Sequence, residues 1–270
     1  RGFLIGATSG RTTLNGEGLQ HQDGQSHVQA STIPNCLSYD PSYGYELAVI
    51  IQEGIRRMYG EKQENIFYYL TVTNENYAHP AMKEGMEEGI IKGIYLFDTI
   101  EAKNDYHVKL LGCGAIFEQS RKAAQILAQE YGISSELYSV TSFTNLARQA
   151  QDTHRDNLLN PNKDNQLAYV SKLLGKNSDN TIVAASDYMK AYAEQIRAYV
   201  SGTYEVLGTD GFGRSDSREN LRAHFEVDAA FIVISTLNQL VNKKQINKKI
   251  LLEAMDKFGI NNTKDNPLYS

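Results

Sequence analysis

Residues 12–27 gather the side chains of this sequence that are best suited to acid–base chemistry. Two histidines, His21 and His27, lie there together with two acids, Glu17 and Asp23, and with three glycines. Histidine titrates near neutral pH, and a neighbouring carboxylate can set its tautomer and its charge. No period of 2 or 3.6 residues runs through the segment, so we expect a loop whose glycines let the backbone approach a ligand. Loops with many ionisable groups are typical of functional sites.

The residue types alone leave three other interpretations of this segment open. A solvated polar loop would have the same composition. A metal site built from His21, Asp23 and His27 is a second interpretation, although metal sites usually show clearer ligand spacing or a cysteine. An anion-binding glycine loop is a third, although neither a G-x-G-x-x-G nor a Walker pattern occurs in residues 12–27. Chemistry alone therefore predicts a site here without naming its reaction.

The segments after this loop follow the order that a parallel α/β sheet requires. We expect a short strand at residues 36–39, and a dense β-branched and aromatic run predicts a buried strand at residues 66–72. Between them, apolar residues at helical spacing predict an amphipathic helix over residues 43–59 that ends at Gly60. The second strand delivers residues 73–77 to the carboxyl edge of the sheet, where open sheets place ligand-facing loops. A plain polar connection is the equal alternative.

The rest of the chain repeats this alternation. We expect residues 78–103 to form an extended connection with a short helix near residues 86–92, and a domain boundary near residue 100. Further strands are expected at residues 3–7 (a strand or a helix end), 108–111, 137–140, 181–185 and 205–207. Further helices are expected at residues 27–33, 118–131, 144–156 (with Thr144 as N-cap), 188–200, from Ser217 onward, 229–241 and 248–258.

Two glycine-rich segments follow strands of this second unit. The Gly112-Cys113-Gly114 sequence is predicted to be a tight strand–helix turn in preference to a phosphate cradle. Residues 208–214 combine a flexible backbone with a charge pair and an aromatic side chain. We expect this second segment to line either a site or a dimer interface.

The overall composition excludes several classes of partner. The chain carries 27 Lys and Arg residues against 32 Asp and Glu, a net charge of -5, and it has no run of basic residues, so we expect no nucleic-acid partner. No apolar run approaches the length of a membrane span and no signal peptide is visible, so we expect no membrane anchor. Cys36 and Cys113 lie far apart without a C-x-x-C pattern, which favours reduced thiols in a cytoplasmic protein. Because the sequence starts at Arg1 and runs directly into apolar residues, we expect a preceding part of the protein.

Several motifs together resemble one enzyme family. The Asn-Gly-Glu-Gly-Leu-Gln-His sequence of residues 15–21 is followed by Asp-Gly and Ser-His pairs, and further matching motifs lie at residues 32–36, 39–41, 58–65, 74–77, 138–144 and 207–216. In this order they resemble the homodimeric pyruvate dehydrogenase E1 family, thiamine diphosphate-dependent members of the transketolase superfamily. The resemblance implies an α/β fold in which residues 1–100 are the end of a pyrimidine-binding parallel-sheet domain plus a connection. Residues 101–270 would then form a transketolase C-terminal-like α/β domain.

The resemblance also implies an activity, cofactors and partners. Members of the family decarboxylate pyruvate with thiamine diphosphate and Mg²⁺ as homodimers, and they acetylate the lipoyl group of the dihydrolipoyl acetyltransferase component. The G-D-G…N motif that holds the magnesium and the diphosphate in this superfamily has no counterpart; the nearest strings, at residues 22–24 and 209–211, lack its pattern. We therefore expect most cofactor ligands upstream of Arg1 and no cofactor bound by this chain alone. As an isolated piece, it would be a catalytically inactive dimerisation or scaffold module.

The site residues implied by the resemblance all lie in residues 12–27. His21 matches the active-centre histidine that contacts the substrate-derived part of the adduct, and Glu17 matches a glutamate that tunes proton positions, so both are expected to be catalytic. Substrate-binding roles are expected for the remaining polar candidates: Asp23, His27, Gln20 and Asn15. We also expect the segment to be mobile, because its composition buries little apolar surface.

Overall fold

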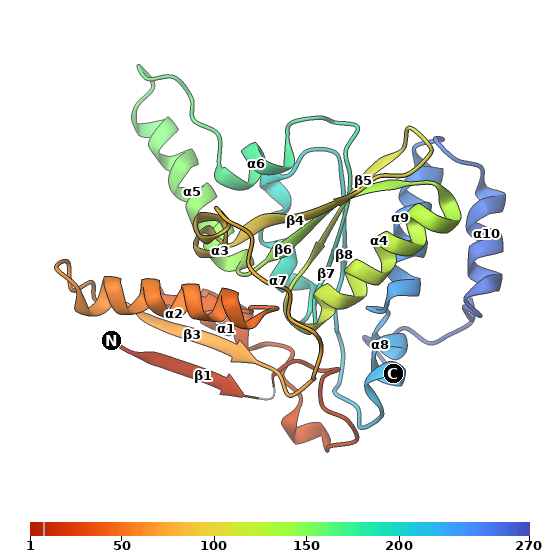
Figure 1. The fold of residues 1–270 in the computed structure, drawn as a ribbon, viewed down its shortest axis with the longest axis horizontal. Coiled ribbons are helices and arrows are strands. Elements are labelled where there is room, and N and C mark those ends of the chain that lie inside the picture. The colour runs from red at the N-terminus through yellow and green to blue at the C-terminus, as the bar shows by residue number, and fades with distance from the viewer. Residues whose placement is uncertain (8) are drawn as a thin grey trace.

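The computed structural model describes residues 1–7 and 9–270, which form two sheets flanked by helices (Figure 1). The strands are β1 (Phe3–Ala7), β2 (Cys36–Tyr39), β3 (Phe67–Val72), β4 (Ile94–Ile100), β5 (His107–Gly112), β6 (Ser134–Val140), β7 (Thr181–Ala185) and β8 (Thr203–Leu207). The α-helices are α1 (Ser26–Ser31), α2 (Gly44–Tyr59), α3 (Glu87–Lys92), α4 (Phe117–Tyr131), α5 (Phe143–Leu159), α6 (Tyr169–Leu174), α7 (Lys190–Glu194), α8 (Arg218–Phe225), α9 (Ala229–Asn242) and α10 (Lys248–Lys257). Three short 3₁₀ turns are η1 (Leu19–His21), η2 (Gly114–Ile116) and η3 (Arg197–Tyr199).

The first sheet has the strand order β1-β3-β2, and both of its pairings are parallel. Parallel neighbours need a crossover, and the amphipathic α2 supplies it between β2 and β3. Ile50 and Met58 of this helix are buried in one cluster with Tyr68 and Leu70 of β3. The strand–helix–strand prediction is confirmed, and residues 3–7 form a strand.

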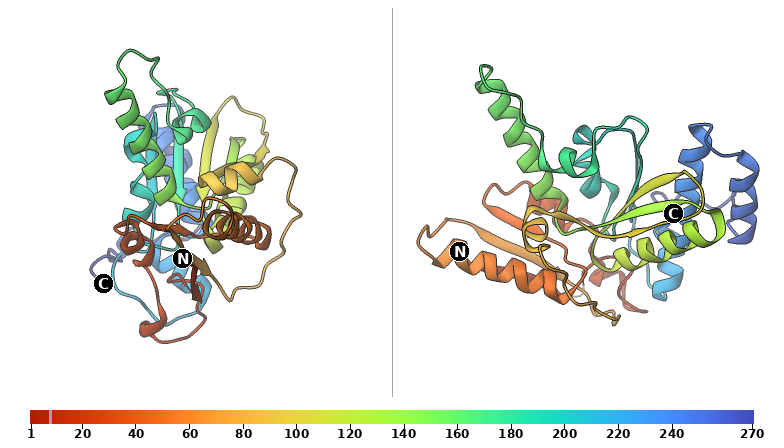
Figure 2. Two further views of the ribbon diagram at one scale, coloured as in Figure 1. Left: turned by 90° about the vertical axis from the view of Figure 1, so that its left-hand side faces the viewer. Right: turned by 45° about the horizontal axis from the view of Figure 1, so that its top comes forward.

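The second sheet has the order β4-β6-β5-β7-β8, with β4 antiparallel and the other strands parallel. Successive residues of a strand point to opposite faces. Leu110 of β5 accordingly joins the cluster formed with α4 and α9, whereas Leu111 joins the cluster formed with α5 and α7. Helices thus cover both faces, as expected for an α/β domain; Figure 2 shows α5 and the connection after it projecting from the body of the molecule.

Three local expectations were wrong. Residues 94–100, expected to be part of a connection, form β4, so the change of sheet falls between β3 and β4 and the range 1–100 includes a strand of the second sheet. The N-cap of α5 is Ser142, whose hydroxyl accepts from Asn145 N (3.0 Å), and not Thr144. The helix expected at residues 188–200 stops at Glu194. The side chains of Gln195 and Tyr204 donate hydrogen bonds to the carbonyls of Tyr192 (3.0 Å) and Ala193 (2.9 Å), which would accept from backbone N–H groups in a longer helix.

The carboxyl ends of the parallel strands in the two sheets face each other, and we call this contact layer the seam. Asp40, which follows β2, donates its backbone N–H to the Thr141 carbonyl after β6 (2.8 Å). Its own carbonyl accepts from Gly114 N after β5 (3.2 Å). On the β1 side, Thr12 N donates to both carboxylate oxygens of Asp187 after β7 (3.1 Å each). The edge that usually holds a ligand crevice is therefore closed along this line by the other half of the same chain.

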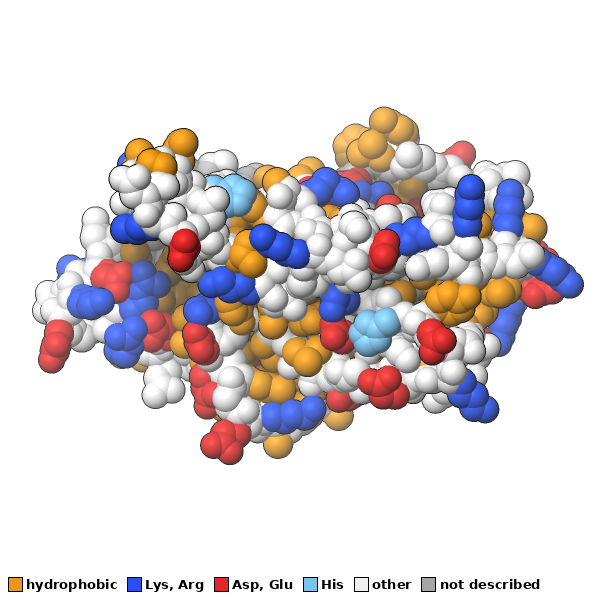
Figure 3. Space-filling model, turned by 90° about the horizontal axis from the view of Figure 1, so that it is seen from above, with side chains coloured by type: hydrophobic (Ala, Val, Ile, Leu, Met, Phe, Trp, Pro, Cys, Tyr) orange, Lys and Arg blue, Asp and Glu red, His pale blue; other side chains and the backbone are white. Residues whose placement is uncertain are grey.

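The surface carries charges of both signs. On the face in Figure 3, Lys and Arg side chains are interspersed with Asp and Glu, without a single-sign stripe. Among the described residues, no helix is both long and apolar enough to cross a bilayer. Cys36 and Cys113 are both free and buried, so they form no bridge with each other.

Candidate functional site

Residues 12–27, the candidate loop, leave the carboxyl end of β1 and cross over the seam to the second unit. Thr12, Thr13 and Leu14 are fully buried at its start. Backbone bonds then hold it on both sides: Asp23 N donates to Gly10 O (3.2 Å), and Gly24 O accepts from Met189 N (3.0 Å). The loop prediction is confirmed apart from the short 3₁₀ turn and the start of α1.

The outer part of the loop presents the predicted catalytic side chains to solvent. His21 ends the 3₁₀ turn η1 and is exposed, as are Asn15, Glu17 and Gln20. Within the described ranges, none of these four side chains makes a hydrogen bond to the protein. The imidazole therefore lies outside the apolar interior, on a turn whose carbonyl of Gly18 accepts from the His21 N–H (3.1 Å).

The side chain of Asp23 binds backbone N–H groups at the start of α1. Its Oδ1 accepts from the backbone N–H groups of Gln25 (3.1 Å) and Ser26 (2.9 Å), and its Oδ2 accepts from the Ser26 hydroxyl. A carboxylate that accepts the free N–H groups at a helix start stabilises that start. Asp23 thus fixes the first turn of α1, and with it the direction in which the loop leaves.

His27 lies on α1 but does not face an opening. Its side chain is fully buried and stacks on Tyr192 of α7 (ring centroids 4.7 Å apart), while Tyr188 meets it edge-on at 4.6 Å. Burial in this aromatic pocket lowers the pKa of His27 to about 3, so the ring is neutral at ordinary pH. The substrate-facing position expected for His27 differs from its place in the structure, because the second unit covers the ring completely.

Two buried carboxyl groups in the seam were not found by sequence reasoning. Asp40 and Asp187 are each only 2% exposed. Burial raises the pKa of Asp40 to about 7. Burial also raises the pKa of Asp187 to about 6, although the charge of Arg222 and the bonds from Thr12 act in the opposite direction. The Tyr-Asp-Pro sequence around residue 40 signalled a turn, but nothing in it signalled burial.

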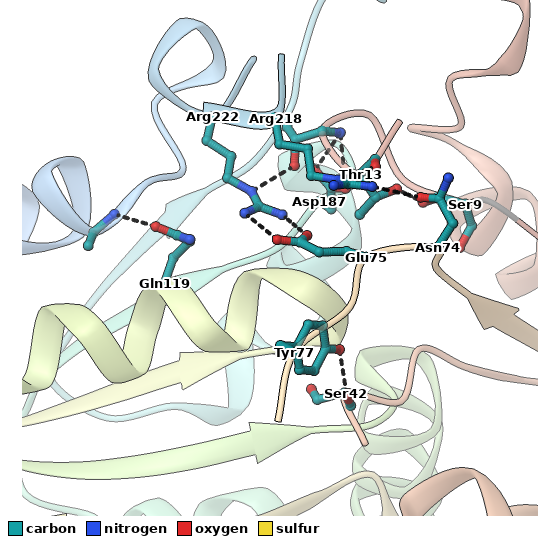
Figure 4. A network of polar contacts seen from close by, with 12 residues as sticks. Ser9, Thr13, Ser42, Asn74, Glu75, Tyr77, Gln119, Asp187, Arg218 and Arg222 are labelled. Atoms are coloured by element: carbon teal, nitrogen blue, oxygen red, sulfur yellow. Dashed lines mark hydrogen bonds and ion pairs between the residues drawn. The ribbon is translucent and has the colours of Figure 1, made fainter. Parts of the chain in front are cut away.

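Two arginines of α8 tie the candidate loop to the residues that follow β3 (Figure 4). Arg222 is buried and pairs with both carboxylate oxygens of Glu75, with Nη1···Oε1 at 3.0 Å, and its Nε donates to Thr12 Oγ1 (3.2 Å). Arg218 donates to the carbonyl of Thr13 (2.6 Å) and to Asn74 Oδ1 (3.3 Å). Within residues 73–77, the side chains of Asn74 and Glu75 thus bond to the protein itself. This segment also lines a cavity of about 300 Å³ at the ends of β2 and β3, so the ligand-facing role and the plain connection both stay open.

Residues 208–214 lie against the candidate loop of the same chain. Arg11, which is buried, donates to the carbonyls of Thr209 and Gly211. The amide of Gln22 exchanges two hydrogen bonds with the backbone of Arg214. Beside these contacts lies an open cavity of about 350 Å³, lined by Leu19, Gly213, Arg214, Ser215, Asp216, Asn220, Leu221 and His224. This segment therefore helps to shape the surroundings of the loop.

The remaining glycine-rich turn is a close-packing feature. The Gly112-Cys113-Gly114 sequence leads from β5 through η2 into α4, which confirms the predicted strand–helix turn. Gly114 has φ +51°, and a Cβ there would lie 2.4 Å from Asp40 Oδ2. Glycine is required because the Asp40 carboxyl group lies directly against the backbone.

The described residues offer no ligand set for a metal ion. Over residues 1–7 and 9–270, no group of three or more His, Cys, Asp or Glu side chains is arranged to hold one. The metal interpretation of His21, Asp23 and His27 fails on geometry, because His27 is buried while His21 is exposed.

Family models match the chain in two consecutive blocks. The pyruvate dehydrogenase E1 component middle domain matches residues 1–80, and the transketolase-like TK C-terminal domain matches residues 93–228, about half of the chain. The chain belongs to the transketolase-like family. The two blocks correspond to the two sheets described above, with the division between β3 and β4.

Similar proteins extend the match over the whole of this transketolase-like chain. It is 58% identical to the pyruvate dehydrogenase E1 component of Escherichia coli strain K12 over 268 residues, which are 99% of this chain and 30% of that protein. It is 53% identical to the pyruvate dehydrogenase E1 component of Pseudomonas aeruginosa over the same shares of both chains. The chain thus spans about 30% of the length of the curated relatives that it matches.

Solved structures confirm the fold. Transketolase from Pichia stipitis in complex with sedoheptulose-7-phosphate superposes with a TM-score of 0.64 at 15% identity, over 89% of this chain and 30% of that one. Transketolase from Campylobacter jejuni gives a TM-score of 0.60 at 16% identity, over 87% and 31%. A split-gene transketolase solved as an inactive beta4 tetramer gives 0.54 at 11% identity, over 88% and 67%. At these identities the likeness concerns the fold alone.

Proposed function

We propose that this chain is the C-terminal part of a pyruvate dehydrogenase E1 component. The whole enzyme would decarboxylate pyruvate with thiamine diphosphate and Mg²⁺ and transfer the acetyl group to the lipoyl group of a dihydrolipoyl acetyltransferase component. The 58% identity with the Escherichia coli enzyme, across 99% of this chain, carries the proposal. We further propose a homodimeric enzyme of the cytoplasm, and the two free buried thiols fit a reducing compartment.

Within this function, His21 and Glu17 are the proposed catalytic residues. Both are exposed on the candidate loop, and the turn η1 holds the backbone of His21 outward from the seam. From this position an imidazole can hold or donate a proton at a substrate carbonyl or carboxylate. Gln20 and Asn15 are proposed as neighbouring substrate contacts. For Asp23 and His27 we propose positioning roles, because the first caps α1 and the second anchors it.

We propose that most ligands of the cofactor lie in another part of the enzyme. Thiamine diphosphate, when bound, supplies the carbanion chemistry that pyruvate decarboxylation needs. In residues 1–7 and 9–270, no group of three or more His, Cys, Asp or Glu side chains is arranged to hold a metal ion. Its proposed contribution is to orient the substrate and to place a proton donor, not to hold the diphosphate.

Replacing His21 by alanine in the full-length enzyme tests the site. We expect turnover of pyruvate to fall by about two orders of magnitude, the usual scale for a positioned acid or base. His154→Ala is the matched control, because His154 is an exposed histidine on the projecting helix α5 and should leave turnover unchanged. Decarboxylation is measured by release of carbon dioxide and by acetylation of a lipoyl domain. Native folding with unchanged turnover would remove His21 from the mechanism.

A second candidate function concerns the chain on its own. For the isolated chain, which spans about 30% of the length of the Escherichia coli enzyme, we propose an inactive dimerisation or scaffold module. Calorimetric titration with thiamine diphosphate and Mg²⁺ distinguishes the two possibilities, and we expect no binding at micromolar concentrations. Micromolar binding by this chain would contradict our assignment of the ligands to another part of the protein.

A further inference from the structure

Three buried polar side chains form a continuous hydrogen-bonded chain across the seam. Nε2 of His27 lies 2.9 Å from Oγ1 of Thr71, and Thr71 Oγ1 donates to Oδ1 of Asp40 at 2.7 Å. His27 and Thr71 have no exposed surface and Asp40 is 2% exposed. They come from three separate elements, namely α1, β3 and the turn after β2. The chain therefore links the helix below the candidate loop to the residue that joins the two sheets.

The count of donors and acceptors fixes the direction of this chain. A hydroxyl group has one proton. Thr71 Oγ1 has two acceptors within reach, Asp40 Oδ1 at 2.7 Å and the Tyr39 carbonyl at 3.3 Å. Because both accept from the single hydroxyl proton, Oγ1 itself accepts from His27, whose neutral ring then carries its proton on Nε2. Asp40 Oδ2 and His27 Nδ1, at the two ends, have no hydrogen-bond partner among the described residues. Buried groups without a partner are uncommon in folded proteins and call for an explanation.

Two tyrosines that surround His27 also carry buried polar groups without a hydrogen-bond partner among the described residues. The rings of Tyr188 and Tyr192 pack against the imidazole, and their hydroxyls are also buried and unpartnered within the described part of the chain. Apolar packing would have been served equally well by phenylalanine. Both rings that enclose the imidazole therefore carry a buried hydroxyl group.

We propose that His27, Thr71 and Asp40 form a proton relay that couples proton uptake by Asp40 to a change of the His27 tautomer. One proton enters at His27 and forms the Nδ1–H bond. The Nε2–H bond breaks, and its proton passes to Thr71 Oγ1, while the original hydroxyl proton of Thr71 passes to Asp40 Oδ1. The result is one added proton, a neutral Asp40, and hydrogen bonds that run in the reverse direction. Solvent supplies the proton, and no electron is transferred.

The electrostatics of the seam make Asp40 a suitable end point. Burial, together with the carboxylates of Asp187 and Asp23, raises the pKa of Asp40 to about 7, while the hydrogen bond from Thr71 acts in the opposite direction. The titratable groups that face Asp40 are Asp23 of the candidate loop, Tyr69 of β3, Tyr77 after β3, Cys113 after β5, Asp187 and Tyr188 after β7, and Tyr192 of α7. None of these is a cation, so a proton is the group that neutralises Asp40.

The relay is a positioning device for α1. His27 lies in the first turn of this helix, directly after the cap provided by Asp23. When the tautomer changes, Nε2 no longer donates to Thr71, and the ring N–H group is on Nδ1 instead. The link to catalysis through His21 rests on the proposed function, but the relay itself does not require pyruvate chemistry.

Side-chain ¹⁵N NMR of the histidine-labelled protein tests the relay without any activity assay. His27 is assigned by elimination, through single replacements of the five other histidines. Between pH 8 and pH 5.5 we expect its proton to move from Nε2 to Nδ1 in one transition with a midpoint near pH 7. Thr71→Val removes the middle hydroxyl and Asp40→Asn removes the titrating group, so in each variant the tautomer should be independent of pH. Thr71→Ser keeps the hydroxyl and should keep the transition.

Several outcomes would overturn the relay. A wild-type His27 that stays in the Nε2–H form throughout this range would do so, and this result needs no variant to fold. A transition that survives in Thr71→Val or in Asp40→Asn would show that the tautomer responds to another group. Loss of pyruvate turnover in a His21 variant bears on the proposed function alone, so the two proposals fail independently.

Discussion

The buried carboxyl group of Asp40 gives the seam a pH-dependent stability that can be worked out from its environment. Burial raises the pKa of Asp40 from its ordinary value of 3.8 to about 7. Between these values the folded state binds a proton that the unfolded state has lost, so this stabilisation is present at low pH and is lost as the pH rises through 7. From pH 5 to pH 8 the loss amounts to about 2.5 kcal/mol at 1.36 kcal/mol per unit of pKa.

Asp40→Asn removes this dependence. The amide oxygen can still accept from Thr71, whereas the group no longer titrates. The unfolding free energy of the variant, relative to wild type, should therefore rise by about 2.5 kcal/mol between pH 5 and pH 8. The amide N–H₂ that replaces Oδ2 has no acceptor among the described residues, so it should lower the free energy of unfolding by the same amount at every pH. The test therefore uses the change of the difference with pH, and not its absolute size.

The assay is urea unfolding of both proteins at pH 5, 6, 7 and 8. His27 contributes with the opposite sign, since its lowered pKa removes stability as the pH falls below about 6.5. Because the charge of Asp187 acts on Asp40, the difference between the two proteins reports Asp40 together with this coupling. Asp256→Asn, at an exposed position on α10, controls for the loss of one negative charge. A difference between Asp40→Asn and wild type that stays constant from pH 5 to pH 8 would refute the account of a carboxyl group neutralised by burial.

Two further predictions concern the contacts that hold the seam. Arg222→Met leaves Glu75 without its partner in a largely buried place, so the free energy of unfolding in urea should fall by about 3 kcal/mol. Adding Glu75→Gln to this variant should restore part of the loss. The control is Arg56→Met, which breaks the exposed ion pair with Glu53 and should cause little change. Gly114→Ala places a Cβ 2.4 Å from Asp40 Oδ2 at φ +51° and should lower the free energy of unfolding by about 2 kcal/mol or more. Gly85→Ala is the control: it has φ +83° and no atom within 4 Å of the added Cβ, so it reports backbone strain alone. Equal losses at the two glycines would show that the close approach to Asp40 is unimportant.

The regular elements could be predicted because each is specified by local patterns. Apolar residues at helical spacing predicted α2, and its observed bounds, Gly44–Tyr59, differ from the prediction by one residue. The strand β4 was missed because acidic residues and glycines before it are typical of a connection, and its pairing partner β6 lies 40 residues further along the chain. A strand that depends on such a distant partner has a weak local signal.

The same difference between local patterns and distant partners applies to the candidate site. The exposure of His21 could be predicted, because a polar glycine-rich loop has little apolar surface to bury. The burial of His27 could not, because it depends on Tyr188 and Tyr192, more than 160 residues later in the chain. Asp40 and Arg222 were missed for the same reason, since each acquires its role only from residues of another element.

The arrangement of the seam determines which part of the candidate loop is open to solvent. Parallel sheets place functional loops at their carboxyl ends, and here the ends of the two sheets are bonded to each other through Asp40, Thr141 and Gly114. These bonds close the contact line itself, while the ends of β2 and β3 border a cavity of about 300 Å³. The loop after β1 instead crosses over the seam, anchored by Leu14 on one side and by His27 on the other, and exposes only the residues between them. The seam thus provides rigidity and the outer turn provides access, so changes at Asp40 or His27 should act on the position of His21 without touching a substrate.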